Sequence, residues 1–283
     1  MRASLRVVAL AVAIAVSLAG VMPPARADAG KPEWSAGDYW VYDVSGLNYL
    51  LSGTGTLRMD VVGIDTANVA GVNYPSHRVR LQLNASVGTF NGGEAWYRVS
   101  DLALVKETFN VTVVIIFPIT VITTISYDPP LAMQWPITNG KTWSASATVI
   151  TVTQVLPFGP GTNTGSVDTT FTVQAAATVI VPAGSFETTP VRAQANGYGV
   201  FYWSPQAGNY ARRQEFGNND AQISSRELTA YRYQGGGFLG LPLVVWFLIV
   251  VVLIFIAAAF VLRSRRKPQM AMPMYMPPQG PPR

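Results

Sequence analysis

The chain has 283 residues, a formal net charge of +5 and a sequence pI of about 9.5. Residues 28–237 nevertheless hold only 12 of the 20 Lys and Arg residues against all 15 Asp and Glu residues, so the basic excess lies in the two ends. This distribution argues against a basic nucleic-acid-binding face, and the lack of cysteine excludes disulfides and a lipid-modified cysteine.

Residues 1–27 have the pattern of a secretory signal peptide. Arg2 and Arg6 form its positive start, residues 7–21 are apolar, and an A-x-A cleavage site occupies residues 25–27. We expect cleavage after this site. The alternative is an uncleaved anchor, which would give the chain two membrane spans.

The region from Gly30 to Gln234 predicts antiparallel β-structure. It has no convincing 3.6-residue apolar pattern, and residues 56–61 and 79–84 alternate between polar and apolar at every step. Successive side chains of a strand point to opposite faces, so each run has one wet face and one core face. No helices are available to connect parallel strands.

The second half of this region repeats the first. VRLQLN at 79–84 recurs as VRAQAN at 191–196, and TGTL at 54–57 recurs as TGSV at 164–167. Further ordered matches join Gly37 and Trp40 to Gly140 and Trp143, and Tyr97 to Trp203. The sequence therefore predicts an all-β fold of two tandem antiparallel β modules, residues 31–130 and 131–234, in a sandwich or a half-open barrel, and it leaves open whether the modules share one sheet. Chance similarity between β-strands is the alternative.

The two copies differ on their inward face. Leu81 and Leu83 of the first copy correspond to Ala193 and Ala195 of the second. Because protein interiors are close-packed, the lost volume must be filled. Two hypotheses remain open: an apolar ligand, or larger neighbouring side chains such as those of Phe171, Phe186 and Phe201.

Residues 111–125 are apolar on both faces. Pro118 lies centrally and most residues are β-branched, which favours two strands, or one strand kinked at Pro118, over a membrane-spanning helix. Such strands are buried on both sides, line a groove, or contact a partner or a membrane.

Three segments of the second copy carry a family resemblance. VPAGSF at 181–186, YWSPQAG at 202–208 and YAR at 210–212 resemble a signature of the TapB-like class of uncharacterised exported β proteins from bacteria and archaea. The match covers about residues 127–215, while the first copy has Arg98-Val99 where the motif has Ser-Pro. The resemblance implies an all-β module associated with the cell envelope, and it implies no activity.

No catalytic, metal-binding or cofactor-binding site is predicted. The single histidine, His77, gives neither a metal cluster nor a Ser-His-Asp arrangement, and no glycine-rich phosphate loop precedes a helix. Carboxylate pairs are few: Asp38 with Asp43, and Asp101 with Glu107. We therefore expect a protein that is not an enzyme, with a hydrolase as the alternative.

Aromatic side chains are the best candidates for contacts with a ligand or partner. Trp96, Tyr97, Tyr202 and Trp203 are singled out, although in a sheet such residues are more often core. Asn84 and Asn110 begin glycosylation acceptor patterns.

The C-terminal end predicts membrane attachment. Residues 235–237 form a glycine linker, residues 238–262 are long and apolar enough for a transmembrane helix, and a basic cluster begins at Arg263. Basic residues mark the cytoplasmic side. We expect the β region outside, and residues 263–283 as a disordered cytoplasmic tail.

The sequence thus indicates a single-pass protein of the cell membrane whose outer β region binds a ligand or partner, a glycan among them, or helps build the envelope. The alternatives are a carrier of a lipid or another apolar molecule, and a hydrolase of an envelope polymer. The membrane is the one partner that the sequence itself indicates, and the ligand stays unidentified.

Overall fold

The computed structural model describes residues 29–46, 53–85, 89–114, 118–156 and 158–235. The chain divides into two compact units, residues 1–236 and 237–283, and every described residue belongs to the first. The predicted signal peptide, transmembrane helix and cytoplasmic tail lie outside the described ranges, as do residues 236 and 237 of the predicted linker. Within the described ranges no helix is long and apolar enough to cross a membrane.

Thirteen β-strands and no helix make up the described residues, which confirms the all-β prediction. The strands are β1 (Tyr39–Ser45), β2 (Thr54–Val69), β3 (Val72–Ala85), β4 (Thr89–Arg98), β5 (Leu104–Val114), β6 (Pro118–Asp128), β7 (Thr142–Leu156), β8 (Gly159–Val173), β9 (Ala177–Val181), β10 (Gly184–Ala195), β11 (Gly197–Ser204), β12 (Asn209–Phe216) and β13 (Gln222–Arg232).

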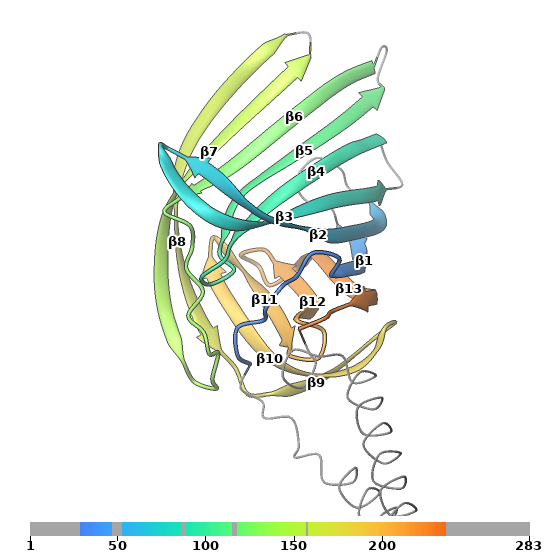
Figure 1. Cartoon of the computed structure of the whole chain (residues 1–283), viewed down its shortest axis with the longest axis vertical. Coiled ribbons are helices and arrows are strands. Elements are labelled where there is room, and N and C mark those ends of the chain that lie inside the picture. Colours follow the sequence, from blue (N-terminus) through green and yellow to red (C-terminus); the bar gives the residue numbers. More distant parts are fainter. Residues whose placement is uncertain (1–28, 47–52, 86–88, 115–117, 157, 236–283) are drawn as a thin grey trace, which may run out of the picture. The chain divides into compact units, whose positions relative to one another are not determined.

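The strands form one closed antiparallel barrel (Figure 1). Neighbours follow chain order from β1 to β8, then β10 to β13, and β13 pairs with β1. β9 stands outside this ring of twelve strands and pairs only with β10. Closing the ring gives each of the twelve strands two hydrogen-bonded neighbours, which removes exposed sheet edges.

The sequence leaves open whether the two predicted modules share one sheet, and in the structure their strands do. β6 of the first predicted module pairs with β7 of the second, from Thr120 with Leu156 to Asp128 with Thr148. The two halves share one sheet because two six-stranded halves with free edges can satisfy those edges on each other.

The registers of the two halves nevertheless correspond. Val61 of β2 pairs with Val79 of β3, and Val173 of β8 pairs with Val191 of β10. The bulge beside Tyr97 in β4 has its counterpart beside Trp203 in β11. These equivalences support the tandem repeat, which stays a prediction.

One landmark of the repeat falls out of register. Trp40 pairs with Met59 in the first half, and Trp143 pairs with Phe171 in the second. Met59 and Phe171 are therefore equivalent, and TGSV at 164–167 lies two positions before the structural counterpart of TGTL, which is residues 166–169.

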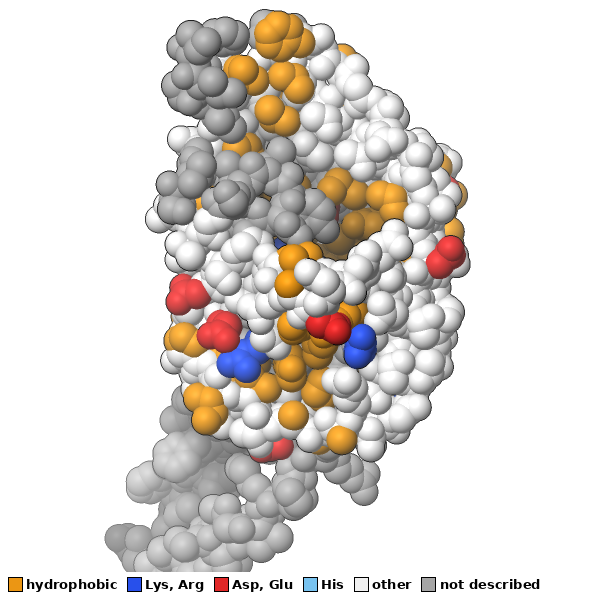
Figure 2. All heavy atoms as spheres, turned by 180° about the vertical axis from the view of Figure 1, so that it is seen from behind, with side chains coloured by type: hydrophobic (Ala, Val, Ile, Leu, Met, Phe, Trp, Pro, Cys, Tyr) orange, Lys and Arg blue, Asp and Glu red, His pale blue; other side chains and the backbone are white. Residues whose placement is uncertain are grey.

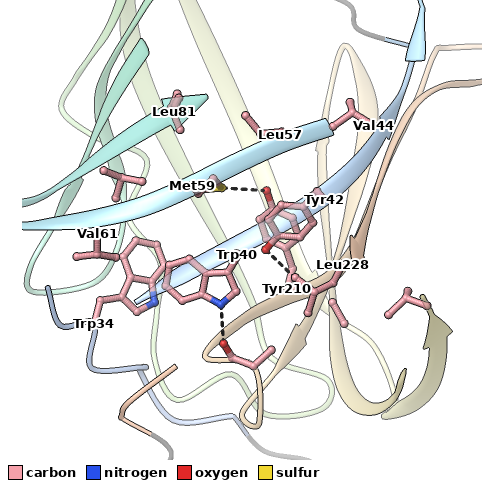
Figure 3. Packing of buried hydrophobic residues seen from close by; sticks show 14 of the residues in the cluster. Trp34, Trp40, Tyr42, Val44, Leu57, Met59, Val61, Leu81, Tyr210 and Leu228 are labelled. Carbon is pink, nitrogen blue, oxygen red and sulfur yellow. Dashed lines mark hydrogen bonds between the residues drawn. The ribbon is translucent and has the colours of Figure 1, made fainter. Parts of the chain in front are cut away.

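The main core cluster joins the two halves (Figure 3). Trp34 and Trp40 lie 5.0 Å apart between ring centroids, and Tyr42 stacks on Tyr210 at 4.9 Å. The Trp40 Nε1 donates a hydrogen bond to the carbonyl of Ala207 at 2.7 Å. Aromatic rings of the first half are thus fastened to the β11–β12 turn of the second.

That turn explains part of the sequence signature. The Trp34 Nε1 donates to the carbonyl of Gly208 at 2.7 Å. Gly208 has a φ of 63°, and a Cβ there would lie 2.5 Å from the ring of Tyr233. Glycine is required because the turn needs both the left-handed conformation and the close approach. This part of the motif therefore has a structural role.

Residues 111–125 form the end of β5 and most of β6, with 115–117 outside the described ranges. The prediction of two strands is confirmed over the described part. Val111 and Ile125 are buried, and Thr108 and Thr112 face Thr124 and Thr120 within hydrogen-bond distance.

Candidate ligand cavity

A cavity of about 580 Å³ lies inside the barrel. Its wall includes Phe171 on β8, Val191, Ala193 and Ala195 on β10, and Phe201 on β11. Its size falls in the range usual for small-molecule sites, about 300–1,000 Å³. Figure 2 shows hydrophobic side chains gathered in a hollow on one face of the molecule. The cavity therefore lies along the strand where the second copy has alanine in place of leucine.

Small residues face one another across this part of the sheet. Ala193 pairs with Gly199 and Ala195 pairs with Gly197, so two adjacent strands leave space at the same level. In the first half the counterpart Leu81 is buried, 5% exposed, and packs in the main core cluster. The open space is thus built by two strands together.

The large neighbours proposed to fill this space do not close it. Phe171 stacks on Trp143 with centroids 4.9 Å apart, and Phe201 remains part of the cavity wall. Phe186 lies elsewhere, edge-on to Tyr231 at 5.7 Å. Larger neighbouring side chains therefore do not fill the space beside the alanines, and a bound apolar ligand is the hypothesis that remains.

A group of charged side chains adjoins the apolar wall. Arg213 and Glu215 on β12 line the cavity and form an ion pair. Arg226 on β13 pairs in register with Arg213 and donates a hydrogen bond from Nη1 to Tyr210 Oη at 3.4 Å. The second oxygen of Glu215 accepts from Ser224 Oγ at 2.6 Å.

Glu107 on β5 belongs to the same electrostatic group. Burial raises the pKa of Glu107, while the charges of Arg226 and Arg213 partly oppose the shift. Glu215 behaves in the opposite way. Burial disfavours its ionised form, but Arg213, Ser224 and Arg226 together hold its pKa below the usual value. One carboxyl thus tends toward the neutral form while its neighbour stays ionised.

The four aromatic candidates divide between two faces. Tyr97 and Trp203 line the cavity, Tyr97 edge-on to Trp34 at 5.2 Å and Trp203 edge-on to Trp135 at 5.2 Å. Both are at equivalent bulges of the two halves.

The other two candidates are absent from the cavity wall. Trp96 packs against the small cluster of Ala67, Val69 and Val105, with Lys106 Nζ 4.2 Å above its ring. Tyr202 is half-buried against the main core cluster.

The remaining polar candidates, His77, Asp38 and Asp101, make contacts that stabilise the fold. His77 is 3% exposed, lies 5.8 Å from the ring of Trp34, and burial lowers its pKa. Asp38 is buried and accepts hydrogen bonds from the backbone amides of Ser35 at 2.8 Å and Gln234 at 2.9 Å. Asp101 pairs with Arg98 at 2.6 Å.

The described residues contain no group of three potential metal-ligating side chains. Of the two glycosylation acceptors, Asn84 is exposed on β3. Asn110 is half-buried on β5 and accepts a hydrogen bond from Asn91 Nδ2 at 3.2 Å.

Sequence reasoning did not identify the charged side chains inside the barrel as a group. The strands that carry Arg213, Glu215 and Arg226 are rich in polar residues, and charged residues on a strand are usually exposed to solvent. The bulge between Tyr202 and Trp203 shifts the parity of β12, and no local sequence signal marks it.

No family model matches the chain, and no curated protein matches it. Two solved structures match the chain at low similarity. A presumed exported protein with a YmcC-like fold from Bacteroides fragilis has 16% identity and a TM-score of 0.42, covering 72% of this chain and 99% of its own. A presumed lipoprotein from Parabacteroides distasonis has 13% identity and a TM-score of 0.33, covering 71% and 97%. The resemblance to the TapB-like class stays a hypothesis.

Proposed function

We propose that this protein is an exported binding protein, held at the outer side of the cell membrane by residues 238–262, which carries a small, largely apolar molecule inside its β-barrel. The observation that carries the proposal is the interior cavity of about 580 Å³ beside Ala193 and Ala195. Apolar space bounded by a few polar groups is the usual form of a ligand site.

The chemistry of the wall supports an apolar ligand. Val149, Val167 and Ile125 add aliphatic surface to the alanines and phenylalanines. Apolar surface that a ligand removes from water contributes about 25 cal/mol per Å² before the costs of association. The predicted anchor would keep the cavity near a bilayer, where apolar molecules are concentrated.

The test compares what co-purifies with the unaltered chain and with a variant whose cavity is filled. Ala193→Leu with Ala195→Leu introduces the side chains that the first half carries at Leu81 and Leu83. Gln194→Leu, an exposed position between them, is the matched control. Each full-length protein is extracted with organic solvent, and the extract is analysed by mass spectrometry.

We expect at least one species to be present with the unaltered chain and the control but lost from the filled variant. A set of extracted molecules that is identical for all three proteins would contradict the proposal. Thermal unfolding of each protein verifies that the filled variant is folded.

A second candidate function has one observation in its favour. Glu107 and Glu215 interact electrostatically in the interior, and their pKa values are shifted in opposite directions, as in hydrolases that use two carboxyl groups. It ranks second because both oxygens of Glu215 already bond to Arg213 and Ser224. Release of soluble fragments from purified envelope polymer, abolished in Glu107→Gln, would favour the hydrolase.

A further inference from the structure

Two arginines face each other across neighbouring strands inside the barrel. Arg213 of β12 and Arg226 of β13 are direct partners in the register. Like charges that are directly opposite destabilise an antiparallel pair unless anions compensate them. Arg213 has its anion, because Glu215 lies two residues along the same strand and forms an ion pair with it.

Arg226 has no such carboxylate. Among the described residues its one hydrogen bond is to Tyr210 Oη at 3.4 Å, and no carboxylate oxygen lies within 4.0 Å of its guanidinium. The internal segments outside the described ranges, 47–52, 86–88, 115–117 and 157, contain no Asp or Glu. A buried or half-buried guanidinium without a counter-charge is costly, so an anion from elsewhere would be bound favourably.

Against the effect of burial, the charge of Glu215 acts on Arg226 and raises the pKa of that guanidinium. Both oxygens of Glu215, however, already bond to Arg213 and Ser224. Glu107 is the other carboxyl of this group. It interacts with Arg226 through space but forms no ion pair with it. Because burial raises the pKa of Glu107, its negative charge is weakened as a counter-ion for Arg226. The interior therefore keeps a positive centre.

This positive centre adjoins the apolar cavity. Tyr210, which accepts the hydrogen bond from Arg226, lines the cavity, and so does Arg213. The same cavity is bounded by Ala193 and Phe201, with the Arg213 guanidinium 4.7 Å above the ring of Phe201. Arg226 itself is not among the wall residues, but its hydrogen-bond partner Tyr210 and its register partner Arg213 both are, and they join its charge to the apolar surface.

We infer that the ligand is an amphiphile with one anionic group, a carboxylate or a phosphate, which pairs with Arg226 while the apolar part lies against Ala193 and Ala195. This inference rests on the proposed function, because it names the class of molecule that the cavity binds. Arginine suits the role because its planar guanidinium donates two parallel hydrogen bonds to carboxylate or phosphate oxygens.

The test uses the full chain in nanodiscs of zwitterionic lipid and a photoreactive long-chain carboxylic acid. Covalent labelling is located by mass spectrometry of peptides that span residues 191–216. Three unlabelled competitors of the same chain length are compared: the acid, the alkyl phosphate and the uncharged alcohol. We expect at least one of the two anions to compete about tenfold better than the alcohol, since a charge-assisted hydrogen bond is the difference between them. The more effective anion identifies the head group.

Three variants then assign the preference to a side chain. Arg226→Met keeps length but removes charge, and we expect it to reduce the preference for the anion to about twofold or less. Arg226→Lys should retain most of the preference. Arg192→Met is the matched control, because Arg192 lies on β10 between cavity positions but is not itself a wall residue; its guanidinium lies 3.8 Å from the ring of Tyr198.

The outcomes separate the inference from the proposed function. Equal competition by acid, phosphate and alcohol would overturn the inference while leaving an apolar ligand in place. Absence of labelling in residues 191–216 would overturn both. An anion preference that survives Arg226→Met would remove Arg226 from the site. Where Arg226→Met fails to fold, Arg226→Gln replaces it, because glutamine removes the charge but keeps a hydrogen-bond donor, and an undiminished preference for the anion in that variant would remove Arg226 from the site.

Discussion

The two halves of the barrel have the same strand registers but use them differently. In the first half Leu81 and Trp40 fill the interior and are nearly inaccessible. In the second half the counterpart of Leu81 is Ala193, which faces Gly199 and borders a cavity. The difference teaches that equivalent positions of one closed sheet can be filled in one half and left open in the other, while both halves contribute to the cavity wall.

The largest expected loss of stability comes from replacing the tryptophans at matching positions of the two halves, Trp40 and Trp143. Trp40→Ala removes a fully buried ring and the hydrogen bond to Ala207, and we expect a loss of about 4 kcal/mol in the free energy of unfolding. Trp143→Ala should cost less, about 3 kcal/mol, because Trp143 belongs to a smaller cluster at the edge of the cavity. Denaturant unfolding of the two variants measures both values. A greater loss for Trp143→Ala would show that the second half is the more tightly packed.

The next effect concerns the leucine and alanine positions themselves. Leu81→Ala should lower the free energy of unfolding by about 3 kcal/mol, since it leaves a new cavity in a filled core. Ala193→Leu fills existing space, so we expect a change of less than about 1.5 kcal/mol in either direction. Unfolding in urea provides the comparison. A loss for Ala193→Leu as large as that for Leu81→Ala would mean that the cavity cannot accept a leucine.

A smaller effect distinguishes interior from exterior ion pairs. Glu215→Gln removes an ion-pair partner of Arg213 inside the barrel, and we expect a loss of about 2 kcal/mol in the free energy of unfolding. Asp60→Asn breaks the pair with Arg58, at 2.6 Å on the outside, and should cost less than about 1 kcal/mol. The same unfolding assay at low and at high salt tests this. Salt should weaken the exterior pair more.

The smallest effect is a pH dependence. The pKa of folded Glu107 is raised, mainly by burial and against the influence of Arg226 and Arg213, with Glu215 and Tyr97 nearby. A raised folded pKa means that this carboxyl contributes stability below its unfolded pKa and loses it as the pH rises through the folded pKa. Glu107→Gln should therefore become more stable relative to the unaltered chain as the pH rises above about 4.5. Thermal unfolding across that range would contradict the assignment if the difference stayed constant.

Local pattern determined much of the fold. Alternation predicted the strands, Pro118 and the β-branched residues predicted two strands in place of a helix, and the VRLQLN and VRAQAN copies marked matching positions of β3 and β10. The exchange of leucine for alanine also pointed to the place where the cavity lies. These features follow from side-chain size and strand periodicity, which the sequence states directly.

Only the tertiary structure decided how the halves join and what faces inward. Pairing of β6 with β7 and of β13 with β1 depends on long-range hydrogen bonds, which carry no local signal. The bulge beside Trp203 reverses the parity of the following strand and helps bring Arg213 and Glu215 to the cavity. Gly197 and Gly199 complete the open space because the register sets them opposite Ala195 and Ala193. Register is a property of two strands together, and a single stretch of sequence cannot specify it.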